Sequence, residues 1–373
     1  MLPSLREHFE IPADVAYFDS AAYSPMPRAV RDAGLAGVAA KCLPWHRDPA
    51  ANHAAAERAR RAAAGLIGAA PGDIAITCSV SFGIETAARN IAVAAGSRIL
   101  HVVDEFPSLV RPFVRLAGEV GAVVEAIARP TDGDWQAAWL EAIARPGPIA
   151  AVLLTPAHWT DGSIIPLAAI AEAARARGAA VVVDATQAAA AMVVDVAVLR
   201  PDFLAFPTYK WLLGPYAVAF LYAAPHRQSG RPIEENSFNR PGADYAEGAR
   251  RYDRGERADP AGIPMAAAGA EFILGLGVEQ VAARLAAMSA ELASIMGAHG
   301  LVVPPPEKRC GHILGAPMAA GEADRLAAAL RAEGVYVSVR NGGLRVSPHV
   351  HVSEADVARF AAVLGAARAR RAA

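Results

Sequence analysis

Ala180-Val181-Val182-Val183-Asp184-Ala185-Thr186-Gln187 is a continuous apolar run that ends on a carboxylate and two more polar side chains. Such a run of apolar, mostly β-branched residues predicts a strand that is buried on both faces of a sheet. A second apolar run, Phe203-Leu204-Ala205-Phe206, precedes Thr208-Tyr209-Lys210-Trp211-Leu212-Leu213-Gly214-Pro215. Ligands of parallel sheets bind beyond the carboxyl ends of the strands. Asp184 and Lys210 are therefore expected to share a site.

Short β-branched runs alternate with alanine-rich segments around these two motifs. The predicted strands are 74–77, 98–103, 122–127, 149–154, 180–183, 203–206 and 217–222. The predicted helices between them include 81–93, 108–120 and 167–177. This alternation predicts an α/β protein whose mostly parallel sheet has helices on both faces.

The pattern changes after residue 226, where Arg, Glu, Asp, Gly and Pro replace apolar periodicity up to residue 262. Two helices are predicted next, at 265–274 and near 278–297. From about residue 300 a strand-helix-strand pattern follows, with strands at 312–314, 335–339 and 344–347, a helix at 323–333 and a final helix at 354–370. We therefore expect a large domain at residues 1–255 and a small C-terminal α+β domain at residues 256–373. The segment 1–30 is expected to pack near the active site.

The composition limits the partners. The chain has 373 residues, 54% of them hydrophobic, and a formal net charge of −1. Such a balance gives no reason to expect nucleic acid as a partner, and the apolar stretches are too interrupted to predict a membrane span. Three cysteines without CxxC spacing predict neither a disulfide framework nor a metal site, and favour a cytoplasmic location.

Asp184 and Lys210 each have an ordinary alternative explanation. Asp184 would make a good N-cap for a following helix, and Lys210 would be explained by an ammonium group that reaches solvent from a domain edge. Flanking aromatic and leucine residues instead predict desolvation, which lowers the pKa of a lysine and makes it nucleophilic. Together the two residues favour a cofactor that has a basic ring nitrogen for the carboxylate and an aldehyde for the amine.

With these motifs, the chain resembles the class V aminotransferases, which use pyridoxal 5′-phosphate (PLP) and include cysteine desulfurases, kynureninase and isopenicillin N epimerase-like proteins. The similarity extends from Tyr17-Phe18-Asp19-Ser20-Ala21-Ala22 to Leu344-Arg345-Val346-Ser347-Pro348-His349. The lysine motif is the most specific part of it. The resemblance implies the type I fold of PLP-dependent transferases, with a seven-stranded, mainly parallel sheet and active sites at the interface of a homodimer.

The resemblance also implies roles for single residues. Lys210 would bind the cofactor aldehyde as a Schiff base and move the Cα proton of the substrate, Asp184 would pair with the pyridine nitrogen, and Gln187 would bind the phenolic oxygen. The cofactor phosphate would lie at the start of the helix after strand 74–77. The residues expected to bind that phosphate are Val80, Ser81, Thr208 and Tyr209. Helix N-termini favour anions, but Ser81 is equally explained as an ordinary helix cap.

Five further residues are assigned by the resemblance. Phe106 would stack on the cofactor ring, with a place in the core as the alternative. Arg345 would bind the substrate α-carboxylate through its planar guanidinium, and Ala22 and Trp159 would line the substrate pocket. Arg257 would reach the cofactor phosphate of the neighbouring subunit, unless it is a solvated loop residue.

The sequence departs from the cysteine desulfurases at Val339-Arg340-Asn341-Gly342-Gly343-Leu344-Arg345, where their nucleophilic cysteine is missing. We therefore expect an aminotransferase that acts at Cα of a small amino acid, with a C–S or C–Se β-lyase or an amino-acid epimerase as alternatives. Two other classes are weaker. A nicotinamide-dependent oxidoreductase lacks its G-x-G-x-x-G motif, and a non-catalytic scaffold protein would be expected to have lost Lys210 or Asp184.

Overall fold

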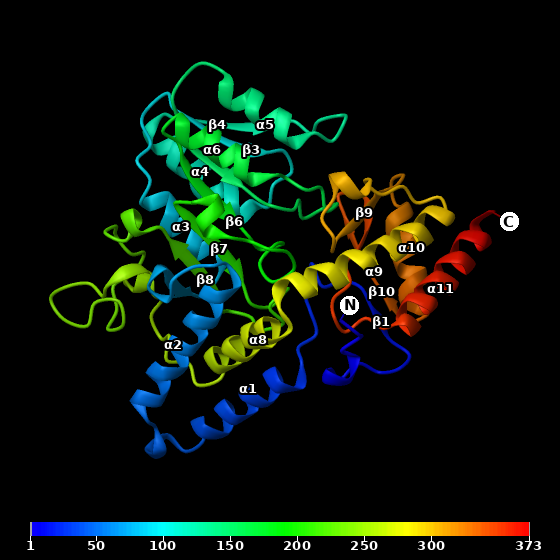
Figure 1. Ribbon diagram of the computed structural model, residues 1–373, viewed down its shortest axis with the longest axis horizontal. Coiled ribbons are helices and arrows are strands. Elements are labelled where there is room, and N and C mark those ends of the chain that lie inside the picture. Colours follow the sequence, from blue (N-terminus) through cyan, green and yellow to red (C-terminus); the bar gives the residue numbers. More distant parts are fainter. Residues whose placement is uncertain (1, 373) are drawn as a thin grey trace.

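The computed structural model describes residues 2–372, arranged as a large α/β domain and a small domain (Figure 1). The large domain contains a seven-stranded sheet in the order β2-β8-β7-β6-β5-β3-β4. Its strands are β2 (Ile74–Thr77), β3 (Arg98–Val102), β4 (Val123–Ile127), β5 (Ile149–Leu154), β6 (Ala180–Asp184), β7 (Phe203–Pro207) and β8 (Ala219–Ala223). In this sheet β8 alone runs opposite to the other strands. The predicted mainly parallel, seven-stranded sheet is confirmed.

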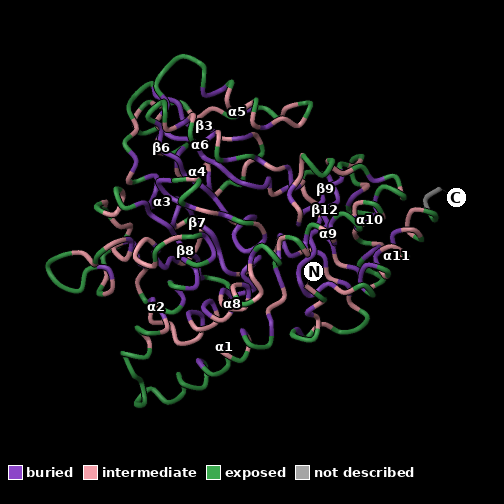
Figure 2. The backbone as a smooth tube through the Cα atoms, viewed as in Figure 1, coloured by how far each residue is buried: buried purple, intermediate pink, exposed green. Residues whose placement is uncertain are grey.

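Alternate residues of each central strand face opposite sides of the sheet. In β6, Val181 and Val183 belong to one apolar core, whereas Ala180 and Val182 belong to another. The first core is completed by α2 (Pro49–Leu66), α5 (Trp135–Ala144), α6 (Leu167–Ala176) and α8 (Gly262–Leu276). The second is completed by α3 (Val80–Arg89) and α4 (Pro107–Val120). Figure 2 shows these central strands as the most deeply buried part of the large domain.

The small domain joins both ends of the chain. Strand β1 (Ala16–Tyr17) pairs in parallel with β10 (Val335–Tyr336). Next to this pair lies an antiparallel sheet in the order β11-β12-β9. Its strands are β11 (Ser338–Arg340), β12 (Gly343–Val346) and β9 (Leu314–Pro317), and the domain's helices are α10 (Glu322–Ala332) and α11 (Glu354–Ala372). The first residues of the chain are thereby held beside the C-terminal strands.

Helix α9 (Val278–Ala298) connects the two domains, as Figure 1 shows. Its first half packs into the large core through Val281 and Leu285, and its second half packs into the small core through Leu292 and Met296. By length and composition α9 would be able to cross a membrane, and it is the one such helix among the described residues. This is weak support for a membrane span, because core helices of soluble proteins pass the same test.

The predicted boundary between the large and the small domain, between residues 255 and 256, stays a prediction. Helix α8 lies after that point in the chain, yet Ile263, Ala267 and Ile273 are buried in the large-domain core. We propose that the large core extends through α8 into the first half of α9, because the apolar face of α8 packs against α1 (Arg28–Lys41) and α2 and because Val281 and Leu285 belong to the same core. The remaining short helices are α7 (Val196–Leu199) and the 3-10 turns Arg6–His8, Pro44–His46, Pro71–Asp73, Pro225–Arg227, Gly248–Tyr252 and Pro306–Lys308.

Candidate active site

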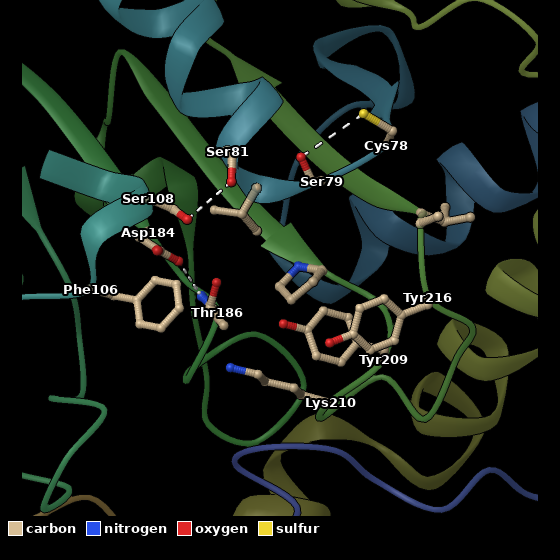
Figure 3. Close-up of a pocket in the computed structure, with 14 residues that line it drawn as sticks. Cys78, Ser79, Ser81, Phe106, Ser108, Asp184, Thr186, Tyr209, Lys210 and Tyr216 are labelled. Atoms are coloured by element: carbon tan, nitrogen blue, oxygen red, sulfur yellow. Dashed lines mark hydrogen bonds between the residues drawn. The ribbon is translucent and has the colours of Figure 1, made fainter. Parts of the chain in front are cut away.

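A cavity of about 270 Å³ lies at the carboxyl ends of β6 and β7, beside the start of α3 (Figure 3). Its wall is formed by Cys78, Ser79, Val80, Ser81, Phe106, Ser108, Asp184, Thr186, Pro207, Tyr209, Lys210, Tyr216, Ala217 and Val218. The structure therefore brings together six residues that the sequence predicted for one site: Val80, Ser81, Phe106, Asp184, Tyr209 and Lys210.

The start of α3 forms one end of the cavity. The hydroxyl of Ser79 accepts a hydrogen bond from the Phe82 amide at 3.1 Å, so Ser79 is the helix cap. Ser81 lies in the first turn, and its hydroxyl bonds to that of Ser108 at 3.0 Å. The ordinary explanation of Ser81 as a cap is thus wrong for this residue. Unpaired amides of a helix N-terminus and the helix dipole favour an anion here.

Asp184 ends β6 with its side chain in the cavity wall (Figure 3). One carboxylate oxygen accepts the Thr186 amide at 2.8 Å. Burial raises the pKa of this carboxyl, although the bond to Thr186 and the charge of Lys210 act in the opposite direction. A buried carboxylate with few donors is stabilised by a cation placed next to it.

Lys210 lies in the tight loop that follows β7. The loop is closed by hydrogen bonds from the Gly214 amide to the Thr208 carbonyl at 2.9 Å and from the Leu213 amide to the Lys210 carbonyl at 3.1 Å. The Lys210 side chain is buried, and its ammonium nitrogen is 5.9 Å from the ring centre of Phe106. Burial, followed by the charge of Arg345, lowers the pKa of Lys210 to about 8. A part of the Lys210 population therefore carries a neutral, nucleophilic amine near pH 7.

Aromatic rings cover the remaining wall. Tyr209 stacks on Tyr216 with 4.1 Å between ring centres, and Tyr23 stacks on Tyr216 at 5.3 Å. Phe106 is 40% exposed and meets the ring of Trp159 edge-on at 5.5 Å. The alternative of Phe106 as a core residue is wrong, because the residue caps α4 at the cavity instead of packing under the sheet.

Two predicted cofactor ligands lie behind the wall. The Gln187 side chain accepts from the Trp211 indole at 2.8 Å and donates to the Ala21 carbonyl at 2.9 Å. The Thr208 hydroxyl donates to the carbonyls of Pro215 and Val218 at 2.5 and 3.1 Å. Neither residue lines the cavity, because both side chains are used to hold neighbouring loops in place. Their predicted contacts with a cofactor stay predictions.

The predicted substrate residues surround the cavity without lining it. The Arg345 guanidinium is buried and donates to the Trp159 carbonyl at 2.7 Å and to Asp19 at 3.2 Å. Burial lowers the pKa of Arg345 to about 10. Ala22 lies in the N-terminal segment, which contacts the site because the Ser24 amide donates to the Tyr209 carbonyl at 3.2 Å. The packing of the whole segment 1–30 near the active site stays a prediction.

Arg257 lies in a buried cluster of charges away from the cavity. Its guanidinium is 3.1 Å from Asp253 and lies over the Phe238 ring at 4.8 Å. Asp253 also pairs with the fully buried Arg60 at 2.7 Å. The alternative of a solvated loop arginine is wrong, because Arg257 is 7% exposed. A contact with a neighbouring subunit stays a prediction.

Sequence reasoning missed several residues of the site. Tyr216 directly follows the quoted lysine motif, and Ser108 opens α4, so both were within reach of the pattern. Glu105 does not line the cavity, but it lies close enough to Asp184 for that charge to act on it. One of its oxygens accepts the Phe106 amide at 2.7 Å, and the other is buried without a partner among the described residues. Burial raises the pKa of Glu105 to about 8, so this carboxyl is mostly neutral at pH 7.

The cavity fits PLP. The buried Asp184 carboxylate is matched to a protonated ring nitrogen, the Lys210 amine to an aldehyde, and the N-terminus of α3 to a phosphate. A further feature is the absence of a metal-binding cluster of His, Cys, Asp and Glu within residues 2–372. The organic cofactor accounts for the polar groups that converge on the cavity.

Comparison with solved structures identifies the fold. The chain superimposes on the apo structure of a cysteine desulfurase from Thermococcus onnurineus NA1 with a TM-score of 0.85, at 22% identity and covering 98% of both chains. It superimposes on the cystine C–S lyase C-DES with a TM-score of 0.84, at 19% identity, covering 94% of this chain and 97% of the other. The fold is thus the expected type I fold of PLP-dependent transferases.

Sequence comparison identifies the family. Residues 16–368 match the family model "Aminotransferase class-V", so the chain belongs to this family and is a PLP-dependent enzyme. It is 27% identical to the uncharacterised aminotransferase YcbU of Bacillus subtilis (strain 168), over 81% of this chain and 80% of the other. It is 30% identical to a cysteine desulfurase of Dickeya dadantii (strain 3937), over 72% of this chain and 68% of the other. Similarity to the isopenicillin N epimerase of Streptomyces clavuligerus, at 31% identity, covers 46% of this chain and 43% of that enzyme.

Proposed function

We propose that this enzyme transfers the amino group of a small amino acid, with Lys210 as the residue that binds PLP and moves the substrate proton. The observation that carries this proposal is the shared cavity of a buried, partly neutral Lys210 and a buried Asp184. The sequence predicted this site on the basis of the same two residues.

PLP, when bound, supplies an electron sink that stabilises negative charge at the substrate Cα. The Asp184 carboxylate would hold a proton on the ring nitrogen, which keeps that sink effective. Thr186 is the one residue that hydrogen-bonds to this carboxylate among the described residues, so the carboxylate keeps acceptor capacity toward the cavity. The first turn of α3, with the Ser81 hydroxyl, would hold the phosphate and so fix the ring over Lys210.

Lys210 Nζ would act as the base. A pKa of about 8 lets the amine accept the proton from the substrate Cα and give it up again without leaving the cavity. Phe106 would cover the cofactor ring, and the Tyr209–Tyr216 stack would close the phosphate side against water.

Transamination ranks first among the reactions of this family for two reasons. The β11–β12 hairpin has no cysteine, and Cys310 is buried, with its thiol pKa raised by burial to about 11, so neither offers the thiolate that a desulfurase needs. An epimerase needs a second acid or base. The described cavity wall offers no second amine or imidazole, and burial raises the pKa of the Tyr209 phenol, which disfavours it as a base.

We also propose a homodimer with each active site near the interface. Helix α1 is largely exposed, as Figure 2 shows, although it carries Leu35 and Val38 at 59% and 57% exposure. Trp45 is 74% exposed, and Tyr23 and Tyr216 beside the cavity are 50% and 58% exposed. Exposed large apolar side chains are enriched on surfaces that bind another protein. The cytoplasmic location stays a prediction, supported by three cysteines that are all free.

Product analysis tests the proposed reaction. The protein loaded with PLP is incubated with single amino acids, with and without a 2-oxo acid as acceptor, and Lys210→Ala is the control. An aminotransferase gives a new amino acid and a new 2-oxo acid only in the presence of the acceptor. Formation of the opposite enantiomer of the added amino acid would show that the enzyme is an epimerase instead. Release of ammonia and pyruvate without an acceptor would show that it is a lyase instead.

A further inference from the structure

The β11–β12 hairpin carries two arginines on one face. Ser338 pairs with Arg345, and Arg340 pairs with Gly343, across the two antiparallel strands. Paired residues of antiparallel strands point to the same side, as do residues two apart in one strand. Arg340 and Arg345 are therefore diagonal neighbours, and Gly343 places no side chain between them. The two-residue turn at Asn341 and Gly342, with φ of 46° and 75°, fixes this register.

The two guanidinium groups differ in their partners. Arg345 is neutralised by Asp19 at 3.2 Å and also donates to the Ser338 hydroxyl at 3.2 Å and the Trp159 carbonyl at 2.7 Å. Arg340 donates to the carbonyl of its own neighbour, Val339, at 2.7 Å. Within residues 2–372, no carboxylate lies at ion-pair distance from Arg340. Of the two arginines on this hairpin, Arg345 is thus paired with a carboxylate of the described chain and Arg340 is not.

Arg340 lies in the wall of a second cavity, of about 240 Å³. Asp104, Arg129, Thr160 and Asp161 are among its other lining residues. Asp161 is already paired with Arg129 at 2.6 Å. Asp104 contributes a carboxylate to the same wall, but it forms no ion pair with Arg340.

Trp159 contacts one residue of each cavity wall. Its indole donates to the Asp104 carbonyl at 2.7 Å, and its ring meets Phe106, which lines the first cavity, at 5.5 Å. Its backbone carbonyl is held by Arg345. A side chain that leaves the active site past Trp159 would therefore arrive at Arg340. The positive charge of Arg340 also lowers the pKa of both Lys210 and Arg345, as expected for a charge close to the site.

We propose that the amino-acid substrate has a side chain that ends in a carboxylate or a sulfonate, and that Arg340 binds this distal anion. Arg345 remains the residue for the α-carboxylate. A distal anion would neutralise the guanidinium of Arg340, which donates to the Val339 carbonyl. This inference rests on the proposed function, and it adds the substrate class to it.

Isosteric substrate pairs test the inference. Initial rates are measured for L-glutamate against L-glutamine, for L-aspartate against L-asparagine, and for L-cysteate. The variants are Arg340→Gln, Arg340→Lys, which keeps the charge, and Arg325→Gln, which removes an exposed arginine of α10 as a control. Binding is followed in parallel by the change in cofactor absorbance on addition of each amino acid.

The wild-type enzyme is expected to prefer the acidic member of a pair in kcat/KM by about tenfold to a hundredfold, the range of one charge-assisted hydrogen-bonded pair. Arg340→Gln should abolish the preference by raising KM for the acidic substrate alone, and Arg340→Lys and Arg325→Gln should keep it. Preference for cysteate over both dicarboxylates would identify the anion as a sulfonate. Equal use of both members by the wild type, or an equal loss for both in Arg340→Gln, would overturn the inference. If no amino acid changes the cofactor spectrum, the proposed function fails instead.

Discussion

His349 lies behind the loop that carries Lys210, and we expect it to make the protein sensitive to acid. Its Nε2–H donates to the Trp211 carbonyl at 3.0 Å, and its Nδ1 accepts the Val350 amide at 2.7 Å. The neutral ring is therefore fully hydrogen-bonded. A proton on Nδ1 would break the second bond and place a charge in the core. Burial, followed by the charge of His351, lowers the pKa of His349 from 6.5 to about 3.

The sign and size of the effect follow from this pKa. The unfolded chain takes up a proton on this histidine below pH 6.5, and the folded protein does so only near pH 3, so stability is lost as the pH falls between these values. From pH 7 to pH 5 the loss from His349 alone is about 2 kcal/mol. This is a large part of the roughly 5–15 kcal/mol that stabilises a typical protein.

The assay is urea unfolding followed by circular dichroism at pH 7 and pH 5. His349→Gln keeps a donor for the Trp211 carbonyl but does not titrate in this range, so its free energy of unfolding should fall less between the two pH values, by about 2 kcal/mol. His46→Gln, at an exposed histidine, should behave like the wild type. An identical pH dependence in His349→Gln and the wild type would refute the reasoning.

Three other perturbations test other parts of the structure. Because the pKa of Lys210 is lowered to about 8, the rate of PLP attachment should rise from pH 6.5 and level off above pH 8, as seen by stopped-flow absorbance; a flat profile would contradict a titrating amine. Arg60→Met removes one of the two arginines that pair with the buried Asp253 carboxylate and leaves Arg257 as the other, so urea unfolding should show a loss of about 1.5–3 kcal/mol, the range for hydrogen bonds to a charged group; an unchanged midpoint would contradict this. Gly162→Ala forces a Cβ to within 2.3 Å of the Ile313 carbonyl oxygen at a φ of +77°, so the melting temperature should fall, with a cost of about 1–3 kcal/mol; an unchanged melting temperature would contradict the strain.

The large domain was readable from the sequence because its signals are local. Each central strand is a short apolar run, and each functional side chain follows directly after such a run. For the same reason the sequence alone predicts that Asp184 and Lys210 share a site, and the β6 and β7 strands that carry them are indeed neighbours.

The small domain was harder to predict because long-range pairing decides its strands. The apolar run 335–339 was predicted as one strand, but it is divided between β10, which pairs with β1 from the other end of the chain, and β11, which pairs with β12. The strand predicted at 312–314 instead begins at Leu314. The His312 side chain is drawn into the core, where it bonds to the Gln187 carbonyl at 2.6 Å.

The sequence did not show which polar side chains hold neighbouring loops in place. Thr208 and Gln187 were expected on the cofactor, and in the structure loop carbonyls and Trp211 occupy their polar groups, so their contacts with a cofactor stay predictions. Arg340 had no motif of its own. Whether a carboxylate lies near Arg340 depends on residues from other parts of the chain, which the sequence does not show. That Arg340 and Arg345 lie on the same face depends on the register of the hairpin, which the sequence did not specify.

The central claim is that Lys210 binds PLP, and the chain offers a direct test because it has three lysines, Lys41, Lys210 and Lys308. The protein loaded with PLP is reduced with sodium borohydride, digested and mapped by mass spectrometry. The account predicts a phosphopyridoxyl group on the peptide with Lys210, and no specific label in Lys210→Ala. A label on Lys41 or Lys308 in the wild type, or no label at all, would contradict it.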